Sequence, residues 1–363
     1  MPEMMLAKRV RLFRRLLPLR VVPGEGADAA EEIYQLSRTN FGYRAAIPKP
    51  PTARQAAWNY LVFGLSKGLA LITTVVVARL LEPADFGLFA LALLVINFFE
   101  YVKDLGVGAA LVQSPREWNK FAPTGVTLSA IFGFMAGAVL AAIAPLVATV
   151  LHRPELTPLI RVLAICVTIS ALSAIPAARL RRNLDFRRRI WPEFLGAAVK
   201  AVLTIALAAN GLGVWSLVFG QLAGALALTV LYWWVARTPV EPGFDGQEAR
   251  HLVSFGVSLT GVTLLAFAIF NVDYLAVGVR LGDTQLGLYT LAYRIPELLV
   301  INLCVVISEV LFSSLSRLQY DRGRVAEHYL QVLTVVVTLT APVSVTLATA
   351  APAVIRTLYG PAY

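Results

Sequence analysis

Long apolar runs are the feature of this 363-residue sequence that most restricts its fold. An α-helix needs about 20 apolar residues to cross the ~30 Å hydrocarbon core of a membrane, and several of the runs exceed that length. In lipid every backbone polar group must be hydrogen-bonded within its own segment, which a helix achieves. The sequence therefore predicts an all-α, polytopic membrane helical bundle of about nine helices, at residues 57–80, 87–107, 121–150, 157–178, 192–211, 213–235, 252–279, 286–313 and 328–357.

A patch of arginines, RLRRNLDFRRR at residues 179–189, interrupts two of these runs. Such a patch alone is typical of an arm that binds nucleic acid. Lys and Arg in short loops also set the orientation of a membrane protein, because cytoplasmic loops carry the excess. If the N-terminus is cytoplasmic, the inner segments hold 23 Lys and Arg residues and the outer loops hold four. We therefore expect a multi-pass protein of the bacterial cytoplasmic membrane whose arginine patch contacts anionic lipids, and no nucleic-acid partner.

An internal repeat is visible at an offset of 200 residues. The hexamer GLFALA at 87–92 is matched by GLYTLA at 287–292, and each follows a short acidic outer loop. Six predicted helices separate the two copies, and an even number keeps their direction the same. The pattern predicts two parallel-repeat lobes related by an axis along the membrane normal, as in some transporters.

The repeat suggests a division of the chain. We expect a basic cytoplasmic tail at 1–55, an N-lobe of six helices at 56–235, a cytoplasmic interlobe linker at 236–250, and a partial C-lobe of about three helices at 251–363. On this division the C-lobe is incomplete, either because the chain is a fragment or truncated product or because a partner completes it. The tail contains MLAKRVRLFRRLL, which is either a surface-bound amphipathic helix or part of a solvated segment.

Several motifs together resemble a known family. They are VVVARLLEPADFGLFALALLVINFFEYVKDLGVGAALVQ, RPELTPLIRVLA, RRNLDFRRR, GVWSLV, NVDYLAVGVRLGDTQLGLYTLAYRIPE, VLFSSLSRLQYD and AAPAVIRTLYGPAY. The sequence resembles Wzx-type polysaccharide or lipid-linked oligosaccharide flippases of the multidrug/oligosaccharidyl-lipid/polysaccharide exporter superfamily. Within it the sequence is most similar to the branch exporting colanic- or teichuronic-acid-type polymers.

The resemblance implies a two-lobed bundle around a central cavity. Its substrate would be a polyprenyl-diphosphate-linked oligosaccharide, turned across the membrane for polysaccharide biosynthesis. Its partners would be the polysaccharide polymerase and glycosyltransferase machinery.

Charged residues inside the predicted spans indicate a polar cavity. A Lys or Arg at mid-bilayer costs about 2.5–3.5 kcal/mol when it faces lipid, so such residues face water, form pairs or bind a ligand. We expect Lys67, Lys200 and Arg294 to line a substrate cavity, because a diphosphate headgroup needs cations along its path. Outward movement of negative charge is also favoured by an inside-negative membrane potential.

Three acidic residues of the spans are candidates for ion coupling or for charge pairs: Asp273, Glu297 and Glu100. Glu297 follows Arg294 by three residues, a helical pair spacing, and Asp273 is predicted at a similar depth. Both pairings of Arg294 are therefore open. Pro296 and Pro342 mark positions where helices are expected to bend.

Two other classes of function are alternatives to a flippase. Another exporter of the same superfamily, for drugs or lipids, would share the fold and a charged cavity. An integral-membrane polysaccharide-synthesis enzyme would need catalytic carboxylates or a metal site in a sizeable loop, whereas the predicted loops are short and the three histidines are scattered. We therefore expect neither an enzyme nor a cofactor or metal, and proton or sodium coupling is left open. The two cysteines, Cys166 and Cys304, lie in apolar runs and imply no disulfide.

Overall fold

A computed structural model describes residues 53–103, 105–113, 118–183, 185–237, 242–301, 304 and 322–360. The chain divides into two compact units, residues 1–50 and residues 51–363, and all described residues lie in the second. The predicted basic tail up to residue 52, with its amphipathic segment, lies outside the described residues. Most of residues 302–321 also lie outside them, so the second half of the predicted 286–313 span is not described.

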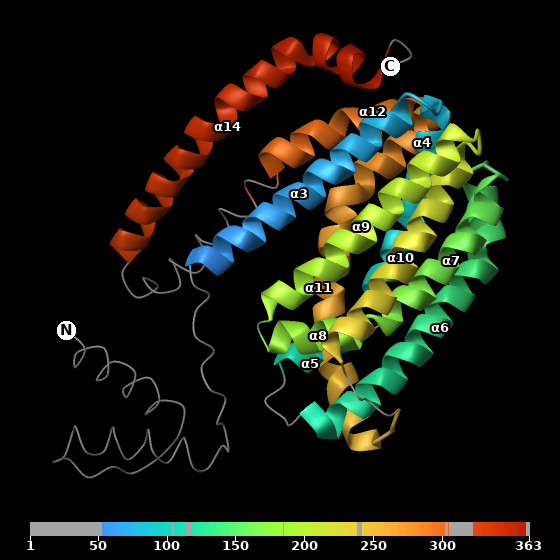
Figure 1. The fold of residues 1–363 in the computed structure, drawn as a ribbon, viewed down its shortest axis with the longest axis vertical. Helices are drawn as coiled ribbons and strands as arrows, with labels where there is room; N and C mark the ends of the chain where they lie inside the picture. Colours follow the sequence, from blue (N-terminus) through green and yellow to red (C-terminus); the bar gives the residue numbers. More distant parts are fainter. Residues whose placement is uncertain are drawn as a thin grey trace. The chain divides into compact units, whose positions relative to one another are not determined.

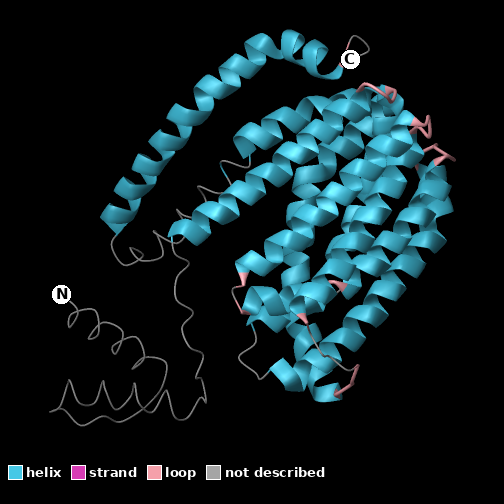
Figure 2. Cartoon of the chain, in the orientation of Figure 1, coloured by secondary structure: helices cyan, strands magenta, loops and turns pink. Residues whose placement is uncertain are grey.

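Regular structure in the described ranges is helical throughout (Figure 2). The first half contains α3 (Ala53–Ala78), α4 (Pro83–Val102), α5 (Val107–Gln113), α6 (Trp118–Val150), α7 (Leu156–Leu172), α8 (Ala174–Arg182), α9 (Phe186–Ala209) and α10 (Val214–Ala236). It is followed by α11 (Gly246–Leu281), α12 (Asp283–Pro296), a π-helical turn η1 (Glu297–Ile301) and α14 (Arg322–Tyr359) (Figure 1). Seven helical segments of this part are long and apolar enough to cross a membrane. The predicted all-α, multi-pass membrane protein is confirmed.

One predicted helix is broken. The span predicted at 157–178 divides at Ser173 into α7 and α8. Pro176 has no N–H, so it cannot donate to the carbonyl of Leu172 four residues earlier. The indole Nε1 of Trp233 on α10 donates to that carbonyl instead, at 3.0 Å. The predicted span is confirmed as one membrane-length segment, Leu156–Arg182, whose helix is interrupted at Ser173. The short helix α5 was not predicted.

The turns predicted to share one side of the membrane lie together. At one end, Nε of Arg153 after α6 lies 2.5 Å from Oδ2 of Asp283 at the start of α12. At the same end, Arg79 after α3 donates to carbonyls at the C-terminal end of α14. This agrees with the predicted alternation of the helices; which end is cytoplasmic stays a prediction.

The opposite end gathers the turns predicted to be cytoplasmic. The guanidinium of Arg182, at the end of α8, lies 5.3 Å from the ring centroid of Phe121 near the start of α6. The backbone N–H of Asp245, just before α11, donates to Oγ1 of Thr124 at 3.1 Å. The start of α11 is therefore fixed to α6 at Asp245.

The two repeat hexamers meet where α4 packs against α12. A Cβ added to Gly87 would lie 1.8 Å from the carbonyl oxygen of Asp283, and one added to Gly287 would lie 1.8 Å from that of Pro83. Pro83 and Asp283 begin the two helices and are themselves 200 residues apart. The contact is therefore reciprocal, as two parallel copies facing each other across an axis require. The division into an N-lobe, a linker and a partial C-lobe stays a prediction.

Candidate functional site

A cavity of about 610 Å³ opens between helices of both repeat copies. Its walls come from α3, α4, α9, α10, α11, α12 and η1. The lining residues are Ala70, Thr73, Thr74, Val77, Phe86, Phe89, Ala90, Leu93, Leu94, Asn97, Ala197, Lys200, Ala201, Thr204, Leu217, Phe270, Asn271, Tyr274, Thr290, Leu291, Tyr293, Arg294, Glu297 and Ile301. A mainly apolar cavity with a few polar groups is typical of a small-molecule site.

Lys200 enters this cavity from α9, and its amine donates to Oε1 of Gln221 on α10 at 2.5 Å. Glycines allow α10 to approach α9 this closely. A Cβ on Gly224 would lie 2.9 Å from the Cβ of Lys200, and one on Gly220 would lie 1.8 Å from Oγ1 of Thr204. Small residues at such positions are typical of helix contacts in membranes. Gln221 carries no charge, so this contact is a hydrogen bond and not an ion pair.

Arg294 and Glu297 line the cavity from the end of α12 and the start of η1. Nη1 of Arg294 lies 3.1 Å from Oε2 of Glu297, and both side chains are more than a third exposed. Pro296 ends the regular helix between them, at one of the two positions predicted to bend. Among the described lining residues, the charged groups are thus two cations and one carboxylate.

Lys67, the third predicted cation, is not among the residues lining the cavity. It lies on α3 three residues before Ala70 and seven before Thr74, both of which line it. Residues three and seven apart share a helix face. Lys67 therefore lies on the cavity-facing side of α3, about one turn closer to the N-terminal end of that helix.

Asp273 on α11 accepts a hydrogen bond from the hydroxyl of Tyr289 on α12 at 2.5 Å. Its Oδ1 atom is buried without a hydrogen-bond partner in the described part of the chain. Asp273 does not line the cavity, and Arg294 is paired with Glu297 rather than with it. The sequence had left both pairings open.

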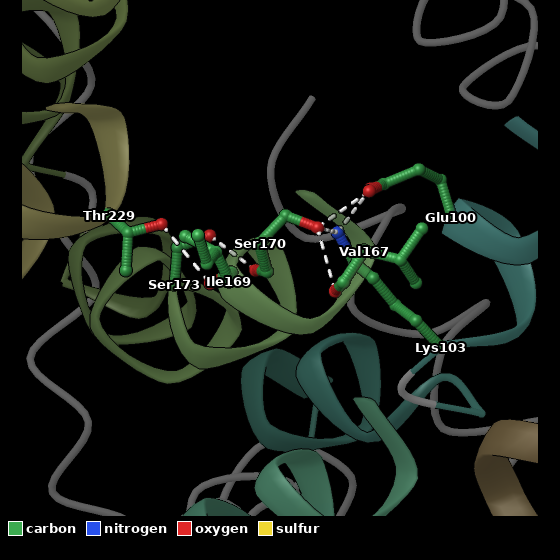
Figure 3. A network of polar contacts seen from close by, with 7 residues as sticks. All are labelled: Glu100, Lys103, Val167, Ile169, Ser170, Ser173 and Thr229. Atoms are coloured by element: carbon green, nitrogen blue, oxygen red, sulfur yellow. Dashed lines mark hydrogen bonds and ion pairs between the residues drawn. The ribbon is translucent and has the colours of Figure 1, made fainter. Parts of the chain in front are cut away.

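Glu100 lies in a separate polar network near the C-terminal end of α4 (Figure 3). It forms an ion pair with Lys103, and Oγ of Ser170 on α7 donates to Oε1 of Glu100 at 2.6 Å. The amine of Lys103 also donates to Ser170, at 2.7 Å. The network ties α4 to α7 three residues before the α7–α8 break at Ser173. Glu100 therefore lies away from the cavity lining.

Two tyrosines of the cavity were missed by reasoning from charge. Tyr274 and Tyr293 line it, and with Tyr289 they form a three-ring cluster. Tyr289 and Tyr293 are four residues apart, so the sequence placed both on one face of a helix. Their meeting with Tyr274 depends on how α11 packs against α12.

The described residues contain no cluster of three or more His, Cys, Asp or Glu side chains able to hold a metal ion. Cys166 is buried and Cys304 is half-buried, and both are free thiols. The polar groups that line the cavity are an amine, a guanidinium, a carboxylate, amides, phenols and threonine hydroxyl groups.

Comparison with known proteins places this arrangement in a family. The model of the family described as polysaccharide biosynthesis protein matches residues 76–363. The succinoglycan biosynthesis transport protein ExoT of Rhizobium meliloti (strain 1021) is 26% identical over 80% of this chain. The lipopolysaccharide biosynthesis protein WzxC of Escherichia coli (strain K12) is 23% identical over 78%, and the teichuronic acid biosynthesis protein TuaB of Bacillus subtilis (strain 168) is 25% identical over 72%. The chain spans 58%, 58% and 55% of the lengths of these three relatives.

A solved structure gives the fold. The inward-facing conformation of a multidrug resistance MATE family transporter of the MOP superfamily has a TM-score of 0.61 to this chain at 17% identity. The match covers 81% of this chain and 72% of that one. At this identity the likeness concerns the course of the helices alone. The family match extends over most of the sequence and includes every described helix from α4 onward, so the chain belongs to the polysaccharide biosynthesis protein family.

Proposed function

We propose that this chain acts in flipping polyprenyl-diphosphate-linked oligosaccharides across the bacterial cytoplasmic membrane, for polysaccharide biosynthesis. The observation that carries the proposal is the placement of Lys200 and Arg294 on one cavity between the repeat copies. The substrate, the orientation of the chain in the membrane and its partner proteins are all parts of this proposal.

The physical problem of the reaction is the headgroup. A diphosphate and its sugars cannot enter hydrocarbon without losing their hydration, whereas the polyprenyl tail can stay in lipid. Hydrogen bonds from cationic donors to phosphate oxygens are shorter and stronger than neutral ones. Lys200 and Arg294 supply such donors, and with the N-terminus cytoplasmic the inside-negative potential would favour outward transfer by about 2.3 kcal/mol per charge per 100 mV.

The names of the relatives support a role in polysaccharide biosynthesis. Succinoglycan, lipopolysaccharide and teichuronic acid are different polymers, and the name of ExoT includes transport. We expect the shared substrate to be a lipid-linked intermediate rather than one particular sugar. We expect polymerases and glycosyltransferases as partners, and anionic lipids around the arginines of residues 179–189.

Proteoliposomes test the function directly. The purified chain is reconstituted with a fluorescent polyprenyl-diphosphate oligosaccharide, and the label remaining accessible to an impermeant quencher is followed in time. Lys200→Gln and Arg294→Gln should each slow transfer by about 10- to 100-fold, because a hydrogen bond to a charged group is worth about 1.5–3 kcal/mol. Lys67→Gln should act in the same direction.

Arg161→Gln is the matched control, since Arg161 is an exposed cation of α7 outside the cavity. It should leave the transfer rate unchanged. The competing function, export of a drug by the same fold, predicts efflux of ethidium from the same vesicles and no movement of the labelled lipid.

A further inference from the structure

The cavity has two walls that occupy equivalent places in the repeat and differ in chemistry. Four positions of the first copy line it with small or apolar groups and one amide: Thr74, Leu93, Leu94 and Asn97. The residues 200 positions later line it with aromatic and charged groups: Tyr274, Tyr293, Arg294 and Glu297. The wall formed by α11, α12 and η1 therefore carries aromatic and charged groups at positions where its counterpart on α3 and α4 carries none.

The tyrosines on this wall are held in a fixed arrangement. The rings of Tyr289 and Tyr293 are stacked at a centroid distance of 5.9 Å and an interplanar angle of 23°. The ring of Tyr274 is nearly perpendicular to both, at 5.3 Å from Tyr289 and 6.0 Å from Tyr293. Aromatic pairs favour these offset and edge-to-face geometries. The wall thus offers a preorganised aromatic surface.

The hydroxyl groups divide the three tyrosines into two kinds. That of Tyr289 is used within the protein, since it donates to Asp273, and Tyr289 does not line the cavity. Tyr274 and Tyr293 line the cavity, and their hydroxyl groups form no hydrogen bond to the residues that the structure describes. Tyr289 is thus used by its contact with Asp273, whereas Tyr274 and Tyr293 combine ring packing with surface that faces the cavity.

We propose that Tyr274 and Tyr293 bind a sugar ring of the oligosaccharide headgroup, with Glu297 accepting hydrogen bonds from its hydroxyl groups. This rests on the proposed function and assigns the part of the site that distinguishes sugar from diphosphate. A pyranose has a face of C–H groups that suits the negative face of an aromatic ring, and a rim of hydroxyl groups that suits carboxylate and phenol oxygens. Arg294, next to Tyr293 in sequence and on the same wall, places a cation for the diphosphate beside the first sugar.

Binding measurements with two lipids distinguish sugar binding by the tyrosines from diphosphate binding by Arg294. The chain in nanodiscs is titrated with polyprenyl diphosphate bearing no sugar and with the same lipid bearing the oligosaccharide. Tyr274→Leu and Tyr293→Leu should weaken binding of the sugar-bearing lipid by tenfold or more, and that of the sugar-free lipid by less than twofold. Tyr293→Phe, which keeps the ring, should stay within threefold of wild type. Arg294→Gln should weaken both lipids.

Tyr101→Leu is the control, because Tyr101 is an exposed tyrosine of α4 outside the cavity. Equal weakening of both lipids by the Tyr274 and Tyr293 variants, or no weakening, overturns the sugar-binding role while the proposed function stands. Wild-type protein that binds neither lipid overturns both.

A second measurement uses the wild-type chain, so it does not depend on how the variants fold. A diazirine on the first sugar is cross-linked by light and the modified peptides are identified by mass spectrometry. Modification should fall on peptides of α11 and α12 that contain Tyr274 or Tyr293. Modification confined to the opposite wall, around Thr74 and Leu93, contradicts the assignment.

Discussion

Gly287 and Gly87 face each other so closely that a Cβ on Gly287 would lie 3.1 Å from the backbone nitrogen of Gly87. The two glycines occupy the same place in the repeated hexamer, 200 residues apart. The contact between α4 and α12 is therefore one of backbone against backbone. Larger side chains at these positions would hold the two helices apart. Small residues are common at close crossings of membrane helices because they let the backbones approach.

Substitution of either glycine should separate the two helices. Gly87→Ala and Gly287→Ala each introduce a Cβ that would lie 1.8 Å from a carbonyl oxygen. Overpacking of this kind costs about 1–3 kcal/mol, and the midpoint of thermal unfolding in detergent should fall. Gly68→Ala is the control, since no atom lies within 4 Å of the added Cβ. An unchanged midpoint for both hexamer variants would show that α4 and α12 do not approach as described.

The Glu100–Lys103–Ser170 network should respond non-additively to substitution. Glu100→Gln or Lys103→Gln alone leaves one charge of a partly buried pair uncompensated, and each should lower unfolding free energy by about 1–3 kcal/mol. Because the double variant removes both charges, it should be less destabilised than the sum of the two. A double-mutant cycle measures this difference, and strict additivity would mean that the pair contributes no coupling.

Trp233→Phe should destabilise the α7–α8 junction while keeping an aromatic ring. The substitution removes the N–H that bonds the carbonyl of Leu172, and an unpaired polar group of this kind costs about 1–3 kcal/mol. Trp234→Phe is a neighbouring control, because Trp234 is 74% exposed. Thermal unfolding of the two variants should differ, with the Trp233 variant lower. Equal midpoints would show that the hydrogen bond from Trp233 to the carbonyl of Leu172 does not stabilise the α7–α8 junction.

The orientation of the chain is tested by labelling in intact cells. After Cys166 and Cys304 are replaced by Ala, single cysteines are introduced at the exposed positions Asn183 and Thr284. An impermeant maleimide should label Thr284→Cys in whole cells and Asn183→Cys only after lysis, because residues 179–191 are predicted to be cytoplasmic. Labelling of Asn183→Cys in whole cells would reverse the orientation.

Prediction from the sequence succeeded where one signal determined the outcome. Apolar length located the starts of the predicted spans between residues 53 and 301 to within about six residues and missed the short α5, because the membrane leaves helix as the stable choice for a long apolar run. The hexamer repeat was visible in the sequence, but the contact between its two glycines was not predicted from it. The break at Ser173 had a visible signal in Pro176, although Pro is tolerated inside many membrane helices, among them α6 at Pro123 and Pro145.

The site was harder to predict because it depends on packing between helices. Lys200 and Arg294 were predictable as costly charges in apolar runs. Their hydrogen-bond partners were of two kinds: Glu297 was available from local spacing, whereas Gln221 lies on another helix. Tyr274 and Tyr293 carry no charge penalty in a membrane, so nothing in a search for unfavourable residues selects them. Only the crossing of α11 and α12 brings their rings together.

The π-helical turn after Pro296 affects the direction in which the charged pair points. Arg294 belongs to α12, and Glu297 opens the turn η1, so their ion pair spans the junction between two helical pitches. A π-turn closes its hydrogen bonds one residue later than an α-turn, and one residue corresponds to about 100° around an α-helix. Rewinding η1 into α-helix would rotate Ile301, its last residue, by about that angle relative to α12. The angle around the helix axis between Arg294 and Ile301, which both line the cavity, is thus set by the π-helical winding between them.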